Sequence, residues 1–336
     1  MKIITGKLGF EDVLVMPRPT ELKSRSEVNL DVSYITKHSR TRFSGIPVCV
    51  ANMDTIGQIG IAKALFKHKI WVALHKFIDT NNLYNFLKEP ESAYCFTTIG
   101  SSNYEQEIEK LKFIYRGEGS TPKICIDAAN AYMYSFLDVI KRIRENFTNS
   151  IILAGNVCTP EGVENIIKAG ADIAKCGIAN GSFCDTKNKA GVGYKQFSVA
   201  MECGQAANEL NALCCSDGGC KNPADICKAL GAGSHMVMTG TLFGGAIESE
   251  GEWIKDENGN KKAIKFYGMS SISANKKYFG GLKSYRASEG KEGFIEARGS
   301  VEDIALDIKG SLASCCTYTN TKNLENLYKN CVFTTS

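Results

Sequence analysis

The sequence has no long run of apolar residues, and no stretch approaches the roughly 18 residues of a membrane-spanning helix. Its first residues, MKIITGKLGFEDVLVMPRP, lack the continuous apolar core of a secretion signal. It also has no block of one charge, because 40 Lys and Arg residues and 36 Asp and Glu residues are interspersed and leave a net charge of +4. We therefore expect a soluble, cytoplasmic protein that binds neither a membrane nor nucleic acid.

Several common ligand motifs are also missing. No C-x-x-C pair occurs, Cys214–Cys215 and Cys315–Cys316 are adjacent pairs, and there are only four His, so a thiol and imidazole metal site is not indicated. G-x-G-x-x-G does not follow an early apolar run, and G-x-x-x-x-G-K-[ST] occurs nowhere. Without a secretion signal, most of the 14 cysteines are expected to be buried small residues rather than disulfide partners.

What the sequence does contain is a series of short apolar, β-branched runs separated mostly by amphipathic stretches. Such an alternation is typical of a parallel sheet covered by helices on both faces. Eight units favour an α/β fold of the parallel (β/α)8 TIM-barrel type, in a single domain over residues 1–336. A doubly wound open sheet is the alternative, but its Gly-rich turn is absent. The runs are 46–53, 70–77, 93–100, 123–130, 150–157, 173–178, 212–219 and 235–241.

Turn and cap signals add detail to this prediction. A helix is expected to begin after Thr159-Pro160 and to end at Gly170. Two segments are longer than a barrel connection needs. Residues 179–195, after the sixth run, are predicted to form a catalytic loop around a cysteine. Residues 245–300, after the eighth run, are rich in Gly, Ser, Lys and Glu and are predicted to form a long mobile flap, with disorder as the alternative.

Cys184 lies in the first of these long segments, GIANGSFCDTKNKAGVGY, which offers it no core to pack into. Ser182, Thr186 and Lys187 make its surroundings polar and electropositive. Such surroundings favour the thiolate, the form of cysteine that attacks carbon. Loop chemistry alone leaves both a catalytic and a structural thiol open.

Other residues at the predicted strand ends point to a phosphorylated ligand. SDGG (216–219) and TGT (239–241) end the seventh and eighth runs, where barrels often hold a phosphate on backbone N–H groups. Ser182 can add a hydroxyl, and Asp217 can accept hydrogen bonds from ribose hydroxyls. Each Gly pair alone is explained by an ordinary turn, but together they indicate a site for a phosphorylated ligand.

These residues belong to segments that resemble the inosine-monophosphate dehydrogenase/GMP reductase family. YGMSS followed by YRASEGK is similar to the reductase branch of that family. The dehydrogenase branch usually carries a regulatory insert, whereas about fifteen residues separate the second and third runs here. The matching segments span about residues 8 to 318 in family order: LGFEDVLVMPRP, ELKSRSEV, GIPVCVANMDT, ILAGNV, GADIAKCGIANGSFC, GVGYKQ, SDGGC, YGMSS, YRASEGK and DIKGSLASCCTY.

The resemblance implies an NADPH-dependent oxidoreductase that converts GMP to IMP and ammonia in purine salvage. The Cys184 thiolate would add to purine C2, ammonia would leave to give a covalent thioimidate, and hydride would reach C2 to release IMP. Thr186 and Glu289 would relay the proton that the departing amino group needs. One alternative is the dehydrogenase reaction, IMP to XMP with NAD⁺, which uses an Arg–Tyr pair in the flap. Another is a catalytically inactive sensor of purine nucleotides.

The resemblance also implies ligand contacts and a homotetramer in which a neighbouring subunit completes the cofactor site. GMP would contact Ser182, Asp217, Gly218, Gly219, Gly240, Thr241, Gly268, Met269, Ser270, Arg286, Ala287, Ser288 and Gly290. NADPH would contact Lys76, Asp127, Ala128, Ala129, Ile178, Ala179, Met269, Tyr285 and Arg286. The neighbour would add Ser24, Arg25, Ser314, Cys315, Cys316 and Thr317.

The cysteine loop departs from the family pattern, Gly-x-Gly-Pro-Gly-Ser-x-Cys, whose carbonyl groups bind a monovalent cation such as K⁺. Ala179 replaces a glycine, Asn180 replaces the proline, and Asp185 replaces a threonine. The Asp185 carboxylate can either disfavour the thiolate or join the cation site. The resemblance implies a K⁺ site at Ala179, Gly181, Cys184 and Lys187.

Overall fold

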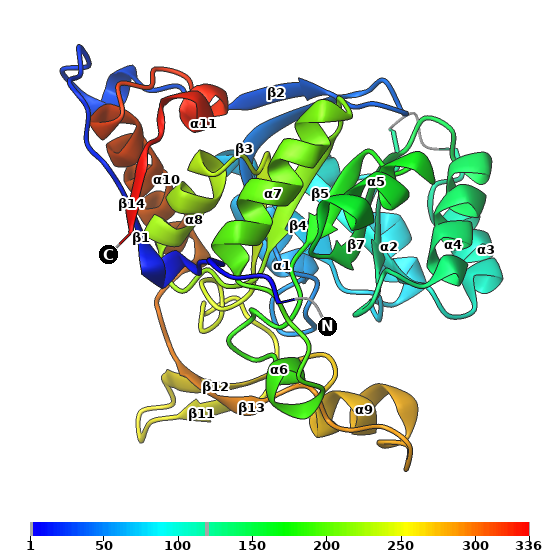
Figure 1. Ribbon diagram of the computed structural model, residues 1–336. Helices are drawn as coiled ribbons and strands as arrows, with labels where there is room; N and C mark the ends of the chain where they lie inside the picture. Colours follow the sequence, from blue (N-terminus) through cyan, green and yellow to red (C-terminus); the bar gives the residue numbers. More distant parts are fainter. Residues whose placement is uncertain (1–2, 118–120, 336) are drawn as a thin grey trace.

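The computed structural model describes residues 3–117 and 121–335, and its centre is a closed barrel of parallel strands (Figure 1). Each barrel strand pairs with the next along the chain, and the last pairs with the first through Val237 and Val48, which closes the barrel. The predicted TIM barrel is therefore confirmed. Its eight strands are β3 (Arg42–Val50), β4 (Ile70–Leu74), β5 (Cys95–Gly100), β6 (Lys123–Asp127), β7 (Ile151–Val157), β8 (Ile173–Cys176), β9 (Leu213–Asp217) and β10 (Met236–Thr239).

Amphipathic helices surround the barrel because each buries one apolar stripe against it. In α4, Phe136, Val139, Ile140 and Ile143 are buried at the spacing of one helical face. The helix predicted after Thr159 begins at Pro160, where the Thr159 side chain accepts a hydrogen bond from the backbone of Gly162. The barrel helices are α1 (Ile59–Leu65), α2 (Thr80–Phe86), α3 (Tyr104–Ile114), α4 (Tyr134–Asn146), α5 (Pro160–Lys168), α7 (Gln196–Glu209), α8 (Pro223–Gly231) and α10 (Val301–Tyr318).

The core is aliphatic with one aromatic cluster. The ring of Trp71 stacks on Phe43 with centroids 4.4 Å apart and lies 5.1 Å from the ring of Phe96. All fourteen cysteines are free thiols, and all but Cys158, Cys184, Cys315 and Cys331 are buried. The expectation that most cysteines serve as small core residues is therefore confirmed. Within the described ranges, no helix is long and apolar enough to cross a membrane.

Shorter elements close the end of the barrel where the strands begin. β2 (Val32–Ile35) runs antiparallel to β3 at this end. β1 (Val13–Val15) pairs with β14 (Phe333–Thr335) at the side of the barrel, beside α8 and α10 (Figure 1). The helix α11 (Leu327–Asn330) lies near β2 at this end (Figure 1).

The segment after β10 forms a three-stranded antiparallel sheet with one helix. Figure 1 shows it beyond the opposite end of the barrel, beside the short helix α6 (Thr186–Lys189) of the cysteine loop. Its mobility stays a prediction. The elements are β11 (Trp253–Lys255), β12 (Lys261–Tyr267), α9 (Ile272–Phe279) and β13 (Glu292–Glu296).

One buried carboxylate anchors this flap to the barrel. Asp54, in the connection after β3, has a side chain that is 1% exposed. Its Oδ2 accepts hydrogen bonds from Tyr267 Oη at 2.7 Å, Tyr278 Oη at 2.8 Å and Lys277 Nζ at 2.9 Å. The ring of Tyr278 also stacks on Phe77 with centroids 3.7 Å apart. The flap is thus held over the carboxyl ends of the strands, where barrels of this type carry their chemistry.

Candidate active site

A cavity of about 1010 Å³ opens between the carboxyl ends of the barrel strands and the flap. Both long segments singled out in the sequence contribute to its wall. It collects most of the predicted site residues: Ser182, Cys184, Thr186, Asp217, Gly218, Gly219, Gly240, Thr241, Gly268, Met269, Ser270, Arg286, Glu289 and Gly290 from the catalytic and nucleotide sets, and Lys76, Asp127, Ala128, Ala129, Ile178, Ala179 and Tyr285 from the cofactor set.

Cys184 is half-buried in this cavity, and its Sγ lies 3.2 Å from Thr186 Oγ1. The loop folds back on itself, because the backbone N–H of Cys184 donates to the carbonyl of Gly181 at 2.9 Å. It is also tied to the flap, since the N–H of Asp185 donates to the carbonyl of Glu289 at 2.6 Å. Cys184 and Gly290 form an isolated antiparallel bridge. The thiol and hydroxyl of the loop thus lie together, and the backbone of Glu289, from a distant segment, is bonded to the same loop.

Two glycines allow the loops around the thiol to approach one another. Gly218, directly after β9, has a φ of +86°, a conformation that L residues rarely adopt. A Cβ on Gly268 would lie 2.5 Å from the carbonyl oxygen of Phe183, the residue next to Cys184. The SDGG turn and the YGMSS segment thus form close-packed walls that a larger residue would push apart.

Sequence reasoning missed Lys175, a charged residue at the floor of the cavity. Lys175 lies in β8, its side chain is 2% exposed, and its Nζ contacts Asp127 Oδ1 at 2.7 Å and Asp217 Oδ2 at 2.9 Å. It also donates to Asn156 Oδ1. Asn156 Nδ2 in turn donates to Asp217 Oδ2 and to the carbonyl of Gly177, both at 2.8 Å. A lysine within an apolar run is a signal, because a buried ammonium needs partners.

This network fixes the charges in the cavity. Burial alone would raise the pKa of Asp127, but the charge and hydrogen bond of Lys175 outweigh it and lower that pKa. Burial alone would lower the pKa of Lys175, but Asp127 and Asp217 outweigh it and raise that pKa well above its usual value. Lys175 is therefore a permanent cation and Asp127 an anion over the whole physiological range.

A second residue that the sequence did not reveal is Glu107, on α3. Its side chain lines the cavity, and its Oε2 is buried with no hydrogen-bond partner among the described residues. Burial raises the pKa of this carboxyl group. In an amphipathic helix with alternating Glu and Lys it looked like an ordinary surface residue.

Some predicted residues lie outside the cavity. Lys187 is exposed on α6, and Ala287 and Ser288 lie in the flap next to lining residues but do not line the cavity themselves. The set assigned to a neighbouring subunit lies on α10 and on η2 (Arg25–Glu27), two elements that contact each other. Cys316 is fully buried, so its side chain does not reach a ligand there. The members of this set are Ser24, Arg25, Ser314, Cys315, Cys316 and Thr317.

The departures in the cysteine loop have structural consequences. Ala179 adopts a φ of +67°, as a glycine would, so the replacement is strained. Asn180 Nδ2 donates to the carbonyl of Tyr194 and to Gln196 Oε1, both at 2.6 Å, and so fixes the loop without a proline. Asp185 Oδ1 accepts from Asn188 Nδ2 at 2.7 Å.

The donors available to a cation in this loop are backbone carbonyl groups. In the part of the chain that the structure describes, no three His, Cys, Asp or Glu side chains are grouped to hold a metal ion. The carbonyl oxygen of Gly181 accepts one internal bond and keeps a second lone pair. Weak neutral oxygen donors of this kind fit a monovalent cation.

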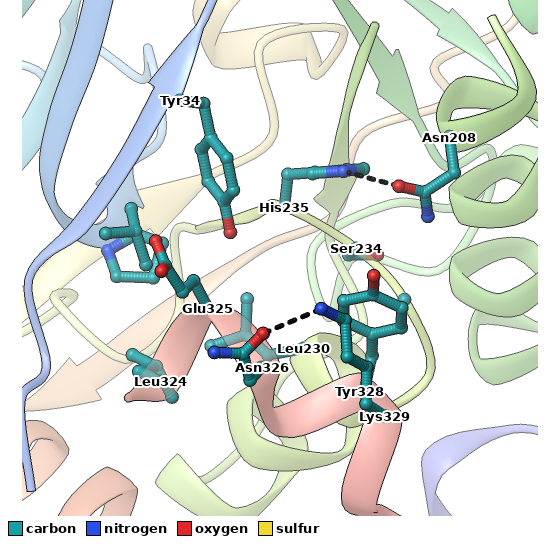
Figure 2. Close-up of a pocket in the computed structure, with 13 residues that line it drawn as sticks. Tyr34, Asn208, Leu230, Ser234, His235, Leu324, Glu325, Asn326, Tyr328 and Lys329 are labelled. Carbon is teal, nitrogen blue, oxygen red and sulfur yellow. Dashed lines mark hydrogen bonds between the residues drawn. The ribbon is translucent and has the colours of Figure 1, made fainter. Parts of the chain in front are cut away.

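A smaller cavity of about 320 Å³ lies at the other end of the barrel, between β2, the start of β10 and the C-terminal segment (Figure 2). Its histidine, His235, uses both ring nitrogens internally: Nε2 contacts Asn208 Oδ1 at 3.1 Å, and Nδ1 accepts from the N–H of Cys214 at 3.2 Å. Burial lowers the pKa of His235 to about 4, so the ring is neutral. Lys329 Nζ is likewise bonded to Asn326 Oδ1 at 2.9 Å.

Comparisons with known proteins identify the family of the chain. A family model described as the IMP dehydrogenase / GMP reductase domain matches residues 7–336. The chain is 44% identical over 328 residues to a GMP reductase of Caenorhabditis elegans, covering 97% of this chain and 91% of that protein. It is 41% identical over 327 residues to GMP reductase 1 of Rattus norvegicus, covering 97% and 94%. It is 45% identical over 330 residues to a GMP reductase of Buchnera aphidicola, covering 97% and 93%. The family model and these relatives match the barrel, the thiol loop and the flap over nearly their whole length. The chain therefore belongs to the IMP dehydrogenase/GMP reductase family.

Proposed function

We propose that the protein is a GMP reductase, which converts GMP to IMP and ammonia with NADPH as the hydride donor. The observation that carries the proposal is the Cys184 thiol, 3.2 Å from the Thr186 hydroxyl, in a loop bonded to the Glu289 backbone. Three relatives that cover nearly the whole chain are named GMP reductases, which supports the reductase rather than the dehydrogenase reaction.

In the proposed reaction the Cys184 sulfur attacks C2 of the purine. A bond forms between sulfur and C2, the exocyclic amino group takes up a proton, and ammonia leaves with the electrons of the C2–N bond. Thr186 is 3.2 Å from the sulfur, so its hydroxyl can pass a proton between the thiol and the leaving nitrogen. Glu289 is the reservoir for that proton. The product of this half of the reaction is a thioimidate on Cys184.

The second half requires a hydride at C2, after which the C2–S bond breaks, IMP leaves and the thiolate is restored. NADPH supplies that hydride when it is bound. On the cofactor side of the cavity, Lys76 places its Nζ 5.2 Å from the ring centre of Phe77 and 5.7 Å from that of Phe279. The Lys76 ammonium group thus lies over two aromatic rings. A bound cofactor can place an anionic or polar group beside the ammonium and a flat ring beside the aromatic side chains.

The nucleotide is held by the turns after the last two barrel strands and by the flap. The N–H groups of Gly219, Gly240 and Thr241 face a phosphate, and Asp217 accepts from ribose hydroxyls. The N–H of Gly218 donates to the carbonyl of Met238 at 3.1 Å, so Gly218 shapes the turn instead of donating to the phosphate. The flap covers the base. The flap residues assigned here are Gly268, Met269, Ser270, Arg286, Ala287, Ser288 and Gly290.

We infer two further features from the family. A homotetramer brings Ser24, Arg25, Ser314, Cys315 and Thr317 of one subunit to the cofactor of its neighbour, while the side chain of Cys316 stays buried. Tyr285, which is 80% exposed, contacts the cofactor from its own subunit. A K⁺ ion is held by carbonyl groups of Ala179, Gly181 and Cys184, with Lys187 closing the set, and keeps the loop in shape.

The test measures the loss of NADPH absorbance with GMP in K⁺ buffer, beside IMP with NAD⁺. GMP-dependent NADPH consumption with release of one ammonia per NADPH is the expected result. Reaction of IMP with NAD⁺ alone would assign the dehydrogenase reaction instead. Replacement of K⁺ by Na⁺ at constant ionic strength tests the cation, and a lower rate is expected.

A further inference from the structure

Lys175 is a buried charged residue that contacts two carboxylates of the larger cavity. It is almost completely buried in β8, between the ends of three other barrel strands. Asp127 ends β6, Asn156 lies near the end of β7, and Asp217 ends β9. Each offers an oxygen to the ammonium group, so all three of its N–H donors are taken. Lys175 is therefore not available to bind a ligand directly.

The two carboxylates beside Lys175 reach from this buried position to the cavity. The Asp127 side chain is 31% exposed and the Asp217 side chain 18%, against 2% for Lys175 itself. Both donors that contact Asp217, Lys175 Nζ and Asn156 Nδ2, use its Oδ2, so Oδ1 takes no part in the network. The buried Lys175 thus orients each carboxylate, and the exposed part of each carboxylate faces the cavity.

We propose, on the basis of the function proposed above, that Lys175 is a positioning residue that links the nucleotide subsite to the cofactor subsite. Asp217 belongs to the first and Asp127 to the second, and one ammonium group balances both. When either carboxylate engages its ligand, the shared ammonium redistributes toward the other. The same network reaches the cysteine loop through Asn156 and the carbonyl of Gly177, so a filled site also steadies the start of that loop.

The experiment is calorimetric titration of GMP and, separately, of NADP⁺ into the full-length protein. Lys175→Met removes the charge but keeps a chain of similar length. It is expected to raise the Kd of both ligands about tenfold or more, since hydrogen bonds to charged groups are lost at each carboxylate. Lys168→Met is the matched control, because Lys168 is 65% exposed and, among the charged groups of residues 3–117 and 121–335, pairs only with Glu164. It is expected to leave both Kd values within twofold.

A second variant addresses transmission between the subsites and remains informative if Lys175→Met does not fold. Asp127→Asn is titrated with GMP alone, although Asp127 is assigned to the cofactor. A rise in the Kd of GMP of about threefold or more is expected, because Lys175 then pairs with Asp217 alone and compensates more of the charge with which that carboxylate accepts from ribose hydroxyls. Lys175→Met acts differently, since it leaves the Asp217 carboxylate charged but removes the group that orients it. In the Lys175→Met background, where that variant folds, the Asp127 substitution should no longer affect GMP, which a general loss of packing would not produce.

Two outcomes overturn the inference: a Lys175→Met protein that folds and binds either ligand as tightly as wild type, or an Asp127→Asn protein with an unchanged Kd for GMP. Failure of the proposed function looks different. In that case the wild type itself either binds neither ligand or binds both without consuming NADPH.

Discussion

Asp54 is predicted to hold the flap closed, and the substitution Asp54→Asn tests it. Three donors from the flap converge on one oxygen of this carboxylate: Tyr267 at 2.7 Å, Tyr278 at 2.8 Å and Lys277 at 2.9 Å. Asparagine keeps the shape and an acceptor oxygen but removes the charge. The stacked pair of Tyr278 and Phe77 remains, so the flap loosens rather than detaches.

The size of the effect follows from the exposure of the partners. A hydrogen bond to a charged group contributes about 1.5–3 kcal/mol, and a neutral one about half as much, so each tyrosine bond loses about 1 kcal/mol. Lys277 is 52% exposed, and its ion pair adds less than about 1 kcal/mol because solvent screens it. Asp54→Asn should therefore raise the free energy of the closed flap by about 2 kcal/mol.

The assay is amide hydrogen–deuterium exchange of α9 and β12. A cost of about 2 kcal/mol corresponds to roughly 30-fold faster exchange in these elements, with the barrel strands unchanged. The KM for GMP should rise as well, because the flap carries Gly268, Met269 and Ser270. The control is Lys277→Met, which removes only the half-exposed partner and should change exchange less than about fivefold. Unchanged hydrogen–deuterium exchange of α9 in Asp54→Asn would refute the prediction that Asp54 holds the flap closed.

The same contact predicts a dependence on pH. Burial alone would raise the pKa of Asp54, but hydrogen bonds from Lys277, Tyr267 and Tyr278 outweigh it and lower the pKa. A carboxyl group whose pKa is lower in the folded than in the unfolded protein stabilises the fold fully above the unfolded value. That contribution is lost as the pH falls through the folded pKa. The flap should stay protected at neutral pH and lose protection only under acid conditions.

Three further substitutions test other parts of the account. Ala179→Gly should stabilise the protein by about 1 kcal/mol in thermal unfolding, because φ is +67° there, and a lower Tm would contradict this. Asp172→Asn should cost about 3–5 kcal/mol in urea unfolding, because this fully buried carboxylate pairs with Arg144 at 2.7 Å and accepts from the N–H of Ile152 at 3.1 Å; an unchanged midpoint would show that the pair is dispensable. Glu289→Gln should lower kcat at least about 100-fold with little change in the Kd of GMP, and a normal kcat would remove Glu289 from the proton relay.

The barrel could be predicted from the sequence because its strands are continuous apolar runs and amphipathic stretches separate most of them. The eight runs coincide with β3 to β10, and the TGT and SDGG turns end the strands expected. The cysteine loop was recognisable because a thiol among Gly, Ser and Asn residues has no core to enter. Both predictions depend on residues that are neighbours in the sequence, so neither requires knowledge of contacts between distant segments.

What the sequence could not provide depends on residues that are distant in the chain. The burial of Lys175 makes sense only once Asp127 and Asp217, 48 and 42 residues away, are beside it. Asp54 lies more than 200 residues from Tyr267, so its role as an anchor has no local pattern. The sequence predicted a mobile or disordered flap because the segment is rich in Gly, Ser, Lys and Glu. Its short strands have no clear apolar pattern, and they pair with one another instead of with the barrel.

The most direct test of the central claim is the rate of GMP-dependent NADPH oxidation by Cys184→Ala beside the wild type. The thiol is the attacking atom, so its removal should lower kcat at least about 10⁴-fold. The Kd of GMP, measured by calorimetry on the same preparation, should stay within about threefold, because the phosphate and ribose contacts come from other loops. Turnover by Cys184→Ala at a rate near that of the wild type would contradict covalent catalysis by Cys184, whatever the protein binds.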